Sequence, residues 1–182
     1  MAGRIDMRIE REKTVALVID YQEKLVPVMA EKETLIHNSA ILLAGLKVLG
    51  VPMVVTQQYT KGLGMTVSEI TDALESDAYV DKISFTAYDS VKNKLYGKRF
   101  VIICGIEAHI CVLQTVVDLV AAGYVPVVVT DCISSRKAND KKIALKRMRD
   151  EGAILTTYES LLFELLKVAG TEESKKIQRL IK

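Results

Sequence analysis

Three side chains in this sequence have the types needed for nucleophilic chemistry: Asp20, Lys82 and Cys111. A cysteine becomes a strong nucleophile when it loses its proton, so it needs a base nearby and a cation to stabilise the thiolate. The carboxylate and the ammonium group could fill these two roles. We therefore ask which elements position the three residues.

Cys111 follows a buried strand and lies at the start of a helix. The apolar run Phe100–Cys104 is typical of a strand buried on both faces, and Gly105 interrupts it. An apolar helix follows and stops at Gly123. The unpaired N–H groups and the dipole of its first turn predict a Cys111 pKa below that of a free thiol. The alternative is that Cys111 is a small core residue.

Strands and helices alternate along the whole chain. Asp20 directly follows the strand 14–19, and Lys82 lies in a weaker strand, 79–83. The residues between 57 and 65, with the glycine pair Gly62 and Gly64, are expected to form a loop. The other expected strands are 52–56, 125–130 and 154–156, and the expected helices are 33–49, 67–74, 90–95, 110–122, 140–151, 158–168 and a charged C-terminal segment, 171–182.

This alternation predicts an α/β fold with a doubly wound, mainly parallel six-stranded sheet, strand order 3-2-1-4-5-6, and helices on both faces. We expect one domain over residues 1–182. Ligands bind such sheets at the carboxyl ends of the strands where the strand order reverses, here between the first and fourth strands. Asp20 and Cys111 are thereby expected beside one crevice.

Each of the other candidate residues also has a structural interpretation. Asp20 could cap a turn, and Lys82 could be an exposed lysine on an edge strand. Cys104 and Cys132 are interpreted as structural residues, and His109 as having a minor role at most.

The composition argues against several classes of function. The 25 basic and 23 acidic residues are nearly balanced, and no basic stripe alternates with aromatic residues, so nucleic acid is not an expected partner. No apolar run is long enough for a membrane span, and the N-terminus lacks a signal-peptide core. Three cysteines without CxxC spacing favour the cytoplasm. No metal-ligand motif is present, and neither a metal nor a cofactor is expected.

Three motifs carry a family resemblance. They are Asp20-Tyr21-Gln22, the segment 82–88 (KISFTAY) and the segment 105–112 (GIEAHICV). On these the chain resembles the isochorismatase-like cysteine hydrolases. The segments 131–136 (DCISSR), 144–148 (ALKRM) and 151–160 (EGAILTTYES) resemble above all the subgroup named only for containing an isochorismatase domain. The resemblance covers nearly the whole chain and implies a catalytic triad of Asp20, Lys82 and Cys111.

The resemblance also implies details of the turn that leads to Cys111, residues 106–111, called here the nucleophile turn. It places a cis peptide bond between Ile106 and Glu107, and an oxyanion hole made by the backbone N–H groups of Glu107 and Cys111. Because these donors are backbone groups, the Glu107 side chain is expected to be dispensable. The pocket for a small-molecule substrate is expected to be lined by Tyr21, Gln22, Phe85, Tyr88 and Ile110.

Two departures from family patterns narrow the expected activity. True isochorismatases lack a cysteine at the position of Cys111, and nicotinamidases carry a D-x-H metal motif where this chain has Thr56-Gln57-Gln58. The sequence therefore predicts hydrolysis of an amide, ureido or carbamoyl C–N bond through a thioester. The alternative is a non-catalytic binding or scaffold protein that retains the hydrolase fold.

The helix 110–122 also bears on assembly. Apolar residues occupy nearly all of its circumference, which is typical of a helix buried on more than its sheet side. We expect a homo-oligomer, whether dimer, tetramer or larger, as the resemblance also implies.

Overall fold

Within residues 7–182, the part of the chain that this computed structural model describes, six strands form one parallel sheet. Their order is β3-β2-β1-β4-β5-β6, and every neighbouring pair is parallel. The predicted fold class and strand order are therefore confirmed. The strands are β1 (Thr14–Ile19), β2 (Met53–Gln58), β3 (Val80–Lys82), β4 (Phe100–Ile106), β5 (Val125–Ser134) and β6 (Ile154–Thr156).

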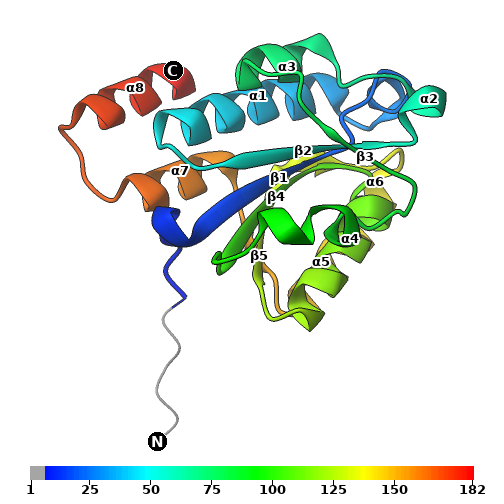
Figure 1. Ribbon diagram of the computed structural model, residues 1–182. Coiled ribbons are helices and arrows are strands. Elements are labelled where there is room, and N and C mark those ends of the chain that lie inside the picture. The colour runs from blue at the N-terminus through cyan, green and yellow to red at the C-terminus, as the bar shows by residue number, and fades with distance from the viewer. Residues whose placement is uncertain (1–6) are drawn as a thin grey trace, which may run out of the picture.

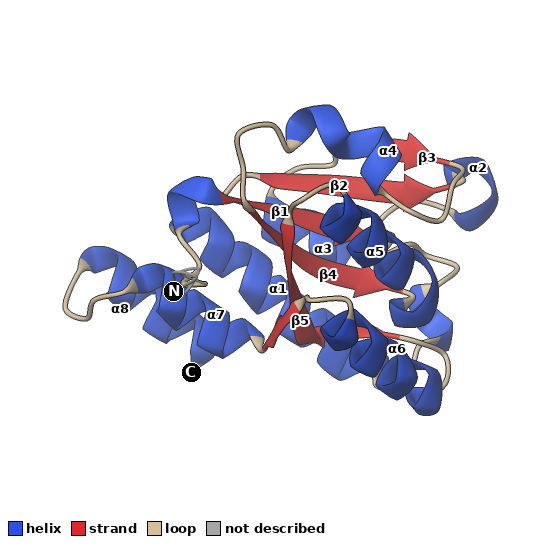
Figure 2. Cartoon of the chain, turned by 90° about the horizontal axis from the view of Figure 1, so that it is seen from below, coloured by secondary structure: helices blue, strands red, loops and turns tan. Residues whose placement is uncertain are grey.

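Two layers of helices cover the sheet (Figures 1 and 2). One layer contains α1 (Lys32–Val48), α3 (Ser68–Leu74), α7 (Tyr158–Leu166) and α8 (Glu172–Ile181). The other contains α4 (Tyr88–Val91), the π-helical turn η4 (Ala108–Val112), α5 (Leu113–Ala121) and α6 (Ala138–Asp150). The short elements are α2 (Thr60–Leu63) and the 3-10 turns η1 (Arg11–Lys13), η2 (Val26–Val28) and η3 (Lys92–Lys94).

The continuous apolar runs of the central strands follow from these two layers. In β1, Ala16 and Val18 pack on the α1 side of the sheet, whereas Val15, Leu17 and Ile19 pack on the α5 side. Successive strand side chains point to opposite faces, so a strand covered on both faces must be apolar at every position.

Gly105 lets β1 and β4 approach closely at the carboxyl end of the sheet. It is paired with Ile19 and has φ +132°, and a Cβ at this position would overlap the Ile19 carbonyl oxygen. Only glycine avoids both the overlap and the unfavourable backbone conformation. The close approach brings Asp20, directly after β1, to the turn that follows β4.

Several element boundaries differ from the sequence-based prediction. β4 continues through Gly105 to Ile106, β2 extends to Gln58, and β5 extends to Ser134. These strand ends are buried in spite of their polar side chains or glycine, so hydropathy alone underestimates their length. A one-turn helix, α2, lies in the segment expected to be a loop, and the helix carrying Cys111 begins with the π-helical turn η4.

None of the helices in residues 7–182 is both long enough and apolar enough to cross a bilayer. The targeting prediction depends partly on residues 1–6, which lie outside the described residues.

The first prediction concerns Gly105. Gly105→Ala should reduce the free energy of unfolding by at least ~3 kcal/mol, because it combines backbone strain with overlap against β1. Gly123→Ala is the matched control: Gly123 has φ +86°, but a Cβ added there would meet no atom within 4 Å, so it should cost only about 1–2 kcal/mol. Urea denaturation measures the free energy of unfolding of both variants. Equal losses for the two variants would contradict the importance of the β1–β4 approach.

Candidate active site

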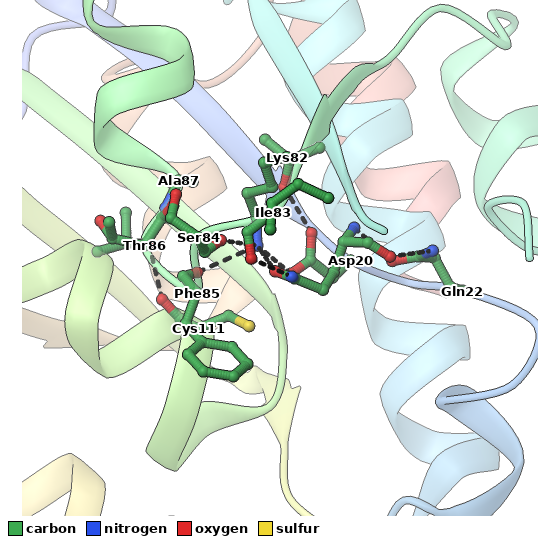
Figure 3. Close-up of polar contacts among 12 residues, drawn as sticks. Asp20, Gln22, Lys82, Ile83, Ser84, Phe85, Thr86, Ala87 and Cys111 are labelled. Atoms are coloured by element: carbon green, nitrogen blue, oxygen red, sulfur yellow. Dashed lines mark hydrogen bonds and ion pairs between the residues drawn. The ribbon is translucent and has the colours of Figure 1, made fainter. Parts of the chain in front are cut away.

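A buried ion pair lies at the carboxyl end of the sheet, where the strand order reverses. Lys82 Nζ is 2.7 Å from Asp20 Oδ2, and both side chains are fully buried (Figure 3). Lys82 thus does not have the solvent-exposed role of an edge-strand lysine. The ammonium group also donates to three oxygens, namely Gln58 Oε1 at 2.7 Å and the backbone carbonyls of Ser84 at 3.3 Å and Phe85 at 3.1 Å.

Asp20 is held on its other side by β2. The Thr56 hydroxyl donates to Asp20 Oδ1 at 2.8 Å, and the Asp20 backbone N–H donates to the Thr56 carbonyl at 3.1 Å. Its backbone is left-handed, with φ +56°, a conformation that aspartate tolerates better than most residues. Burial raises the pKa of the carboxyl group, although Lys82, Thr56 and Cys111 oppose that shift.

Cys111 lies in η4 on the α5 side of the sheet. Two neighbouring groups act on the pKa of its thiol in opposite directions: the Asp20 carboxylate raises it, and the Glu107 backbone lowers it. Burial, followed by the negative charge of Asp20, raises the pKa of the Cys111 thiol to about 12. The predicted lowering of this pKa is therefore wrong.

The physical reason is the position of the Lys82 charge. Lys82 lowers the pKa of Cys111, but its ammonium is directly paired with Asp20, and desolvation outweighs the remaining attraction. With a pKa of about 12, the Cys111 thiol is protonated at neutral pH. In this arrangement Asp20 is placed to accept the thiol proton when a substrate is attacked.

The turn before Cys111 is closed by backbone hydrogen bonds to the Glu107 carbonyl. The Ile106–Glu107 peptide bond is cis, as the resemblance implies. The Glu107 carbonyl accepts hydrogen bonds from the N–H groups of Ile110 at 3.0 Å and Val112 at 3.2 Å, which lie on either side of Cys111. The Glu107 backbone lowers the pKa of the Cys111 thiol. Both expected oxyanion donors thus belong to one short turn.

Three buried polar residues support the site, and the sequence reasoning assigned a role to none of them. Thr56 binds Asp20, and Gln58 binds Lys82. The Thr115 hydroxyl donates to the Cys111 carbonyl at 2.7 Å and accepts from the Ala87 N–H at 2.9 Å, joining α5 to the segment after Lys82. The sequence signal that could have identified these residues is a polar side chain inside an otherwise apolar helix or at the end of an apolar strand.

Two of the expected pocket residues prove to be structural. The Tyr21 hydroxyl lies 2.6 Å from Ser39 Oγ and donates to the Cys132 carbonyl at 2.6 Å, within the core on the α1 side of the sheet. The ring therefore points away from the Cys111 side. The Gln22 amide is bonded to backbone groups only: it donates to the Gln58 and Gly64 carbonyls and accepts from the Gln58 N–H.

The other three expected pocket residues lie on the Cys111 side. Phe85 is 53% exposed, and its carbonyl binds Lys82 (Figure 3). Tyr88 and Ile110 are partly buried and pack against the apolar cluster that contains Cys111. These three side chains can contact a molecule that reaches the thiol.

The remaining cysteines and His109 are positioned away from this chemistry. Cys104 and Cys132 are fully buried, and burial raises the pKa of both thiols. His109 Nδ1 is 2.9 Å from Ser135 Oγ, and its Nε2 is 3.9 Å from Asp140 Oδ2, so the ring faces the end of β5 and the start of α6. Within residues 7–182 no three potential ligands are grouped as a metal site would require.

Comparison with known proteins places this geometry in a family. The isochorismatase domain model matches residues 14–160. A Phytophthora sojae protein named secreted isochorismatase effector Isc1 is 38% identical over 96% of this chain and 87% of its own length. Mouse isochorismatase domain-containing protein 2A is 36% identical over 96% of this chain and 85% of its own.

A solved structure shows the same fold. The structure titled MAR1 ribonuclease from Caenorhabditis elegans superimposes with a TM-score of 0.90 and is 36% identical, over 96% of this chain and 92% of that one. The family model covers every strand from β1 to β6, including the segments that carry Asp20, Lys82 and Cys111. The chain therefore belongs to the isochorismatase family and has its hydrolase fold.

Proposed function

We propose that this protein hydrolyses a C–N bond of a small amide, ureido or carbamoyl compound, with Cys111 as nucleophile. The observation that carries the proposal is that the Lys82 ammonium binds the Asp20 carboxylate at 2.7 Å, and that this carboxylate in turn acts on the Cys111 thiol and raises its pKa. It provides a nucleophile, a base and a cation that fixes the base. A scaffold protein would have no need to bury this charged pair beside a thiol.

In the first half of the reaction, Asp20 accepts the Cys111 proton as the sulfur attacks the substrate carbonyl carbon. The carbonyl oxygen becomes an oxyanion, which the N–H groups of Glu107 and Cys111 stabilise. Each such donor is worth roughly 10²–10³ in rate. Asp20 then gives the proton to the leaving nitrogen, the C–N bond breaks, and an amine or ammonia departs from a thioester.

In the second half, a water molecule adds to the thioester carbonyl, and Asp20 accepts a proton from it. The C–S bond breaks, the acid is released, and the proton returns from Asp20 to the Cys111 sulfur. Lys82 stays paired with Asp20 and holds the carboxylate toward the sulfur throughout. The net reaction consumes one water molecule and regenerates the thiol, with no cofactor.

The substrate contacts are proposed to come from Phe85, Tyr88 and Ile110. Their apolar surfaces and the half-exposed Phe85 ring favour a small, partly apolar molecule. Because the C. elegans relative is named a ribonuclease, RNA should be assayed beside the small compounds.

The second prediction tests the nucleophile. In a screen of small amides, ureas and carbamoyl compounds, any compound turned over by the wild type should be inert with Cys111→Ala. Cys132→Ala, which removes a buried thiol elsewhere, should retain turnover. Mass spectrometry of acid-quenched wild type should find the acyl group on Cys111. Turnover that survives in Cys111→Ala would contradict the proposal.

The third prediction separates the proton-transfer role of Asp20 from any effect on thiolate stability. Asp20→Asn removes the charge and hydrogen bond that raise the Cys111 pKa, so that pKa should fall and alkylation at pH 7 should accelerate at least ~10-fold. Turnover should nevertheless fall roughly 10²–10⁴-fold, because the general base is lost. Iodoacetamide labelling resolved by peptide mass spectrometry, together with steady-state assays, measures both.

Asp81→Asn is the matched control for Asp20→Asn. It neutralises an exposed carboxylate beside Lys82 that binds Thr60 rather than the site. Both readouts should match the wild type. If Asp20→Asn lowered alkylation and turnover together, Asp20 would be acting through thiolate formation rather than as the base in the reaction.

The fourth prediction concerns assembly, and we propose that the protein is a homo-oligomer. Leu113, Val117 and Val120 form a partly exposed apolar side of α5, next to the buried Val116 and Leu119. Light scattering at micromolar concentration should give a mass above 20.2 kDa, the mass of one chain. A monomeric mass would refute the proposal.

A further inference from the structure

The Glu107 side chain is tied to the chain segment that follows β5. Its carboxylate Oε2 accepts hydrogen bonds from both the backbone N–H and the Nε of Arg136, each at 3.1 Å. The Glu107 side chain is 8% exposed, whereas that of Arg136 is 58% exposed. A buried carboxylate is costly unless it is paired and hydrogen-bonded, and these two donors meet that requirement. The expectation that this side chain is dispensable therefore conflicts with its contacts.

Neighbouring contacts join the same two segments. His109 Nδ1 lies 2.9 Å from Ser135 Oγ, and Ile106 is paired with Ser134 in the sheet. Ser134 in turn donates through Oγ to the Ala30 carbonyl at 2.7 Å. The residues from Ser134 to Arg136 thus contact the nucleophile turn along its length. Within that turn, Glu107 accepts two hydrogen bonds, both from Arg136.

We propose that Glu107 is a positioning residue, whose carboxylate, anchored on Arg136, sets the direction in which its own backbone N–H points at the Cys111 site. The inference rests on the proposed function, because that N–H is one of the two oxyanion donors. Donor and anchor belong to the same residue, so fixing the carboxylate restricts rotation of the peptide group that carries the donor. Oxyanion donors act within a narrow range, roughly 2.7–3.1 Å from the oxygen.

A displaced donor has a measurable cost. A misplacement of about 1 Å can reduce the rate about 10²-fold. The loss should fall on kcat rather than KM, because the oxyanion exists only in the transition state and intermediates. The Glu107 backbone also lowers the pKa of the Cys111 thiol, so displacement of this N–H should raise that pKa and slow alkylation of Cys111 at a fixed alkaline pH.

The fifth prediction compares Glu107→Gln and Glu107→Ala with the wild type. Glutamine retains an oxygen acceptor for Arg136, and alanine retains none, so the effects should be graded. We expect kcat to fall ~10-fold with Gln and up to ~10²-fold with Ala at nearly constant KM. Alkylation of Cys111 at pH 9 should slow several-fold in the same order, since a pKa shift of about half a unit changes the thiolate fraction about 3-fold.

Glu151→Gln is the matched control. Glu151 also receives the Nε of an arginine, Arg147, at 3.4 Å, but on the exposed side of α6. It should leave kcat, KM and the alkylation rate unchanged. Arg136→Ala removes only one of the two anchoring bonds, because the backbone N–H remains, and should give a smaller effect than Glu107→Ala.

The alkylation measurement keeps this inference separate from the proposed function. If no substrate were turned over, the alkylation rates would still report whether Glu107 positions its N–H at the sulfur. If Glu107→Ala does not fold, the kcat and the alkylation rate of Glu107→Gln test the inference instead. A folded Glu107→Gln with a lowered melting temperature but wild-type alkylation and kcat would show a purely structural contact and overturn the inference.

Discussion

The ion pair between Lys82 and Asp20 is the interaction on which the site depends. Two opposite charges with fully buried side chains are stable only when paired and hydrogen-bonded, and removing one partner typically costs about 3–5 kcal/mol. Here Thr56 and Gln58 from β2, and the carbonyls after β3, supply the additional bonds. Three adjacent strands are therefore held in register at their carboxyl ends by the groups that form the candidate site (Figure 3).

Burial and this ion pair together shift the pKa of the cysteine. A lysine beside a thiol is often taken to indicate a preformed thiolate. In this site the lysine is bound to the carboxylate, and the carboxylate faces the thiol, so the negative charge adds to desolvation and the pKa of Cys111 rises. In the proposed reaction, a thiol with a raised pKa transfers its proton during attack on the substrate carbonyl rather than before it.

The nucleophile turn is fixed from two directions. Thr115 joins the Cys111 carbonyl to the segment after Lys82, and Glu107 and His109 bind the residues after β5. Catalytic groups must be held close to their productive geometry by neighbours whose own positions are fixed. The three segments that meet here follow β3, β4 and β5, which is why the parallel sheet and its order matter for the chemistry.

The sequence by itself determined the architecture and the end of the sheet at which Asp20 and Cys111 lie. Apolar runs separated by helical patterns specify a parallel sheet covered on both faces, and its strand order places Asp20 beside Cys111. Only the tertiary structure decided the direction of the Cys111 pKa shift, the inward direction of Tyr21, and the contacts of Thr56, Gln58, Thr115 and Glu107. Hydropathy records whether a residue is buried, but a pKa or a hydrogen bond depends on which groups from distant segments lie within a few ångströms.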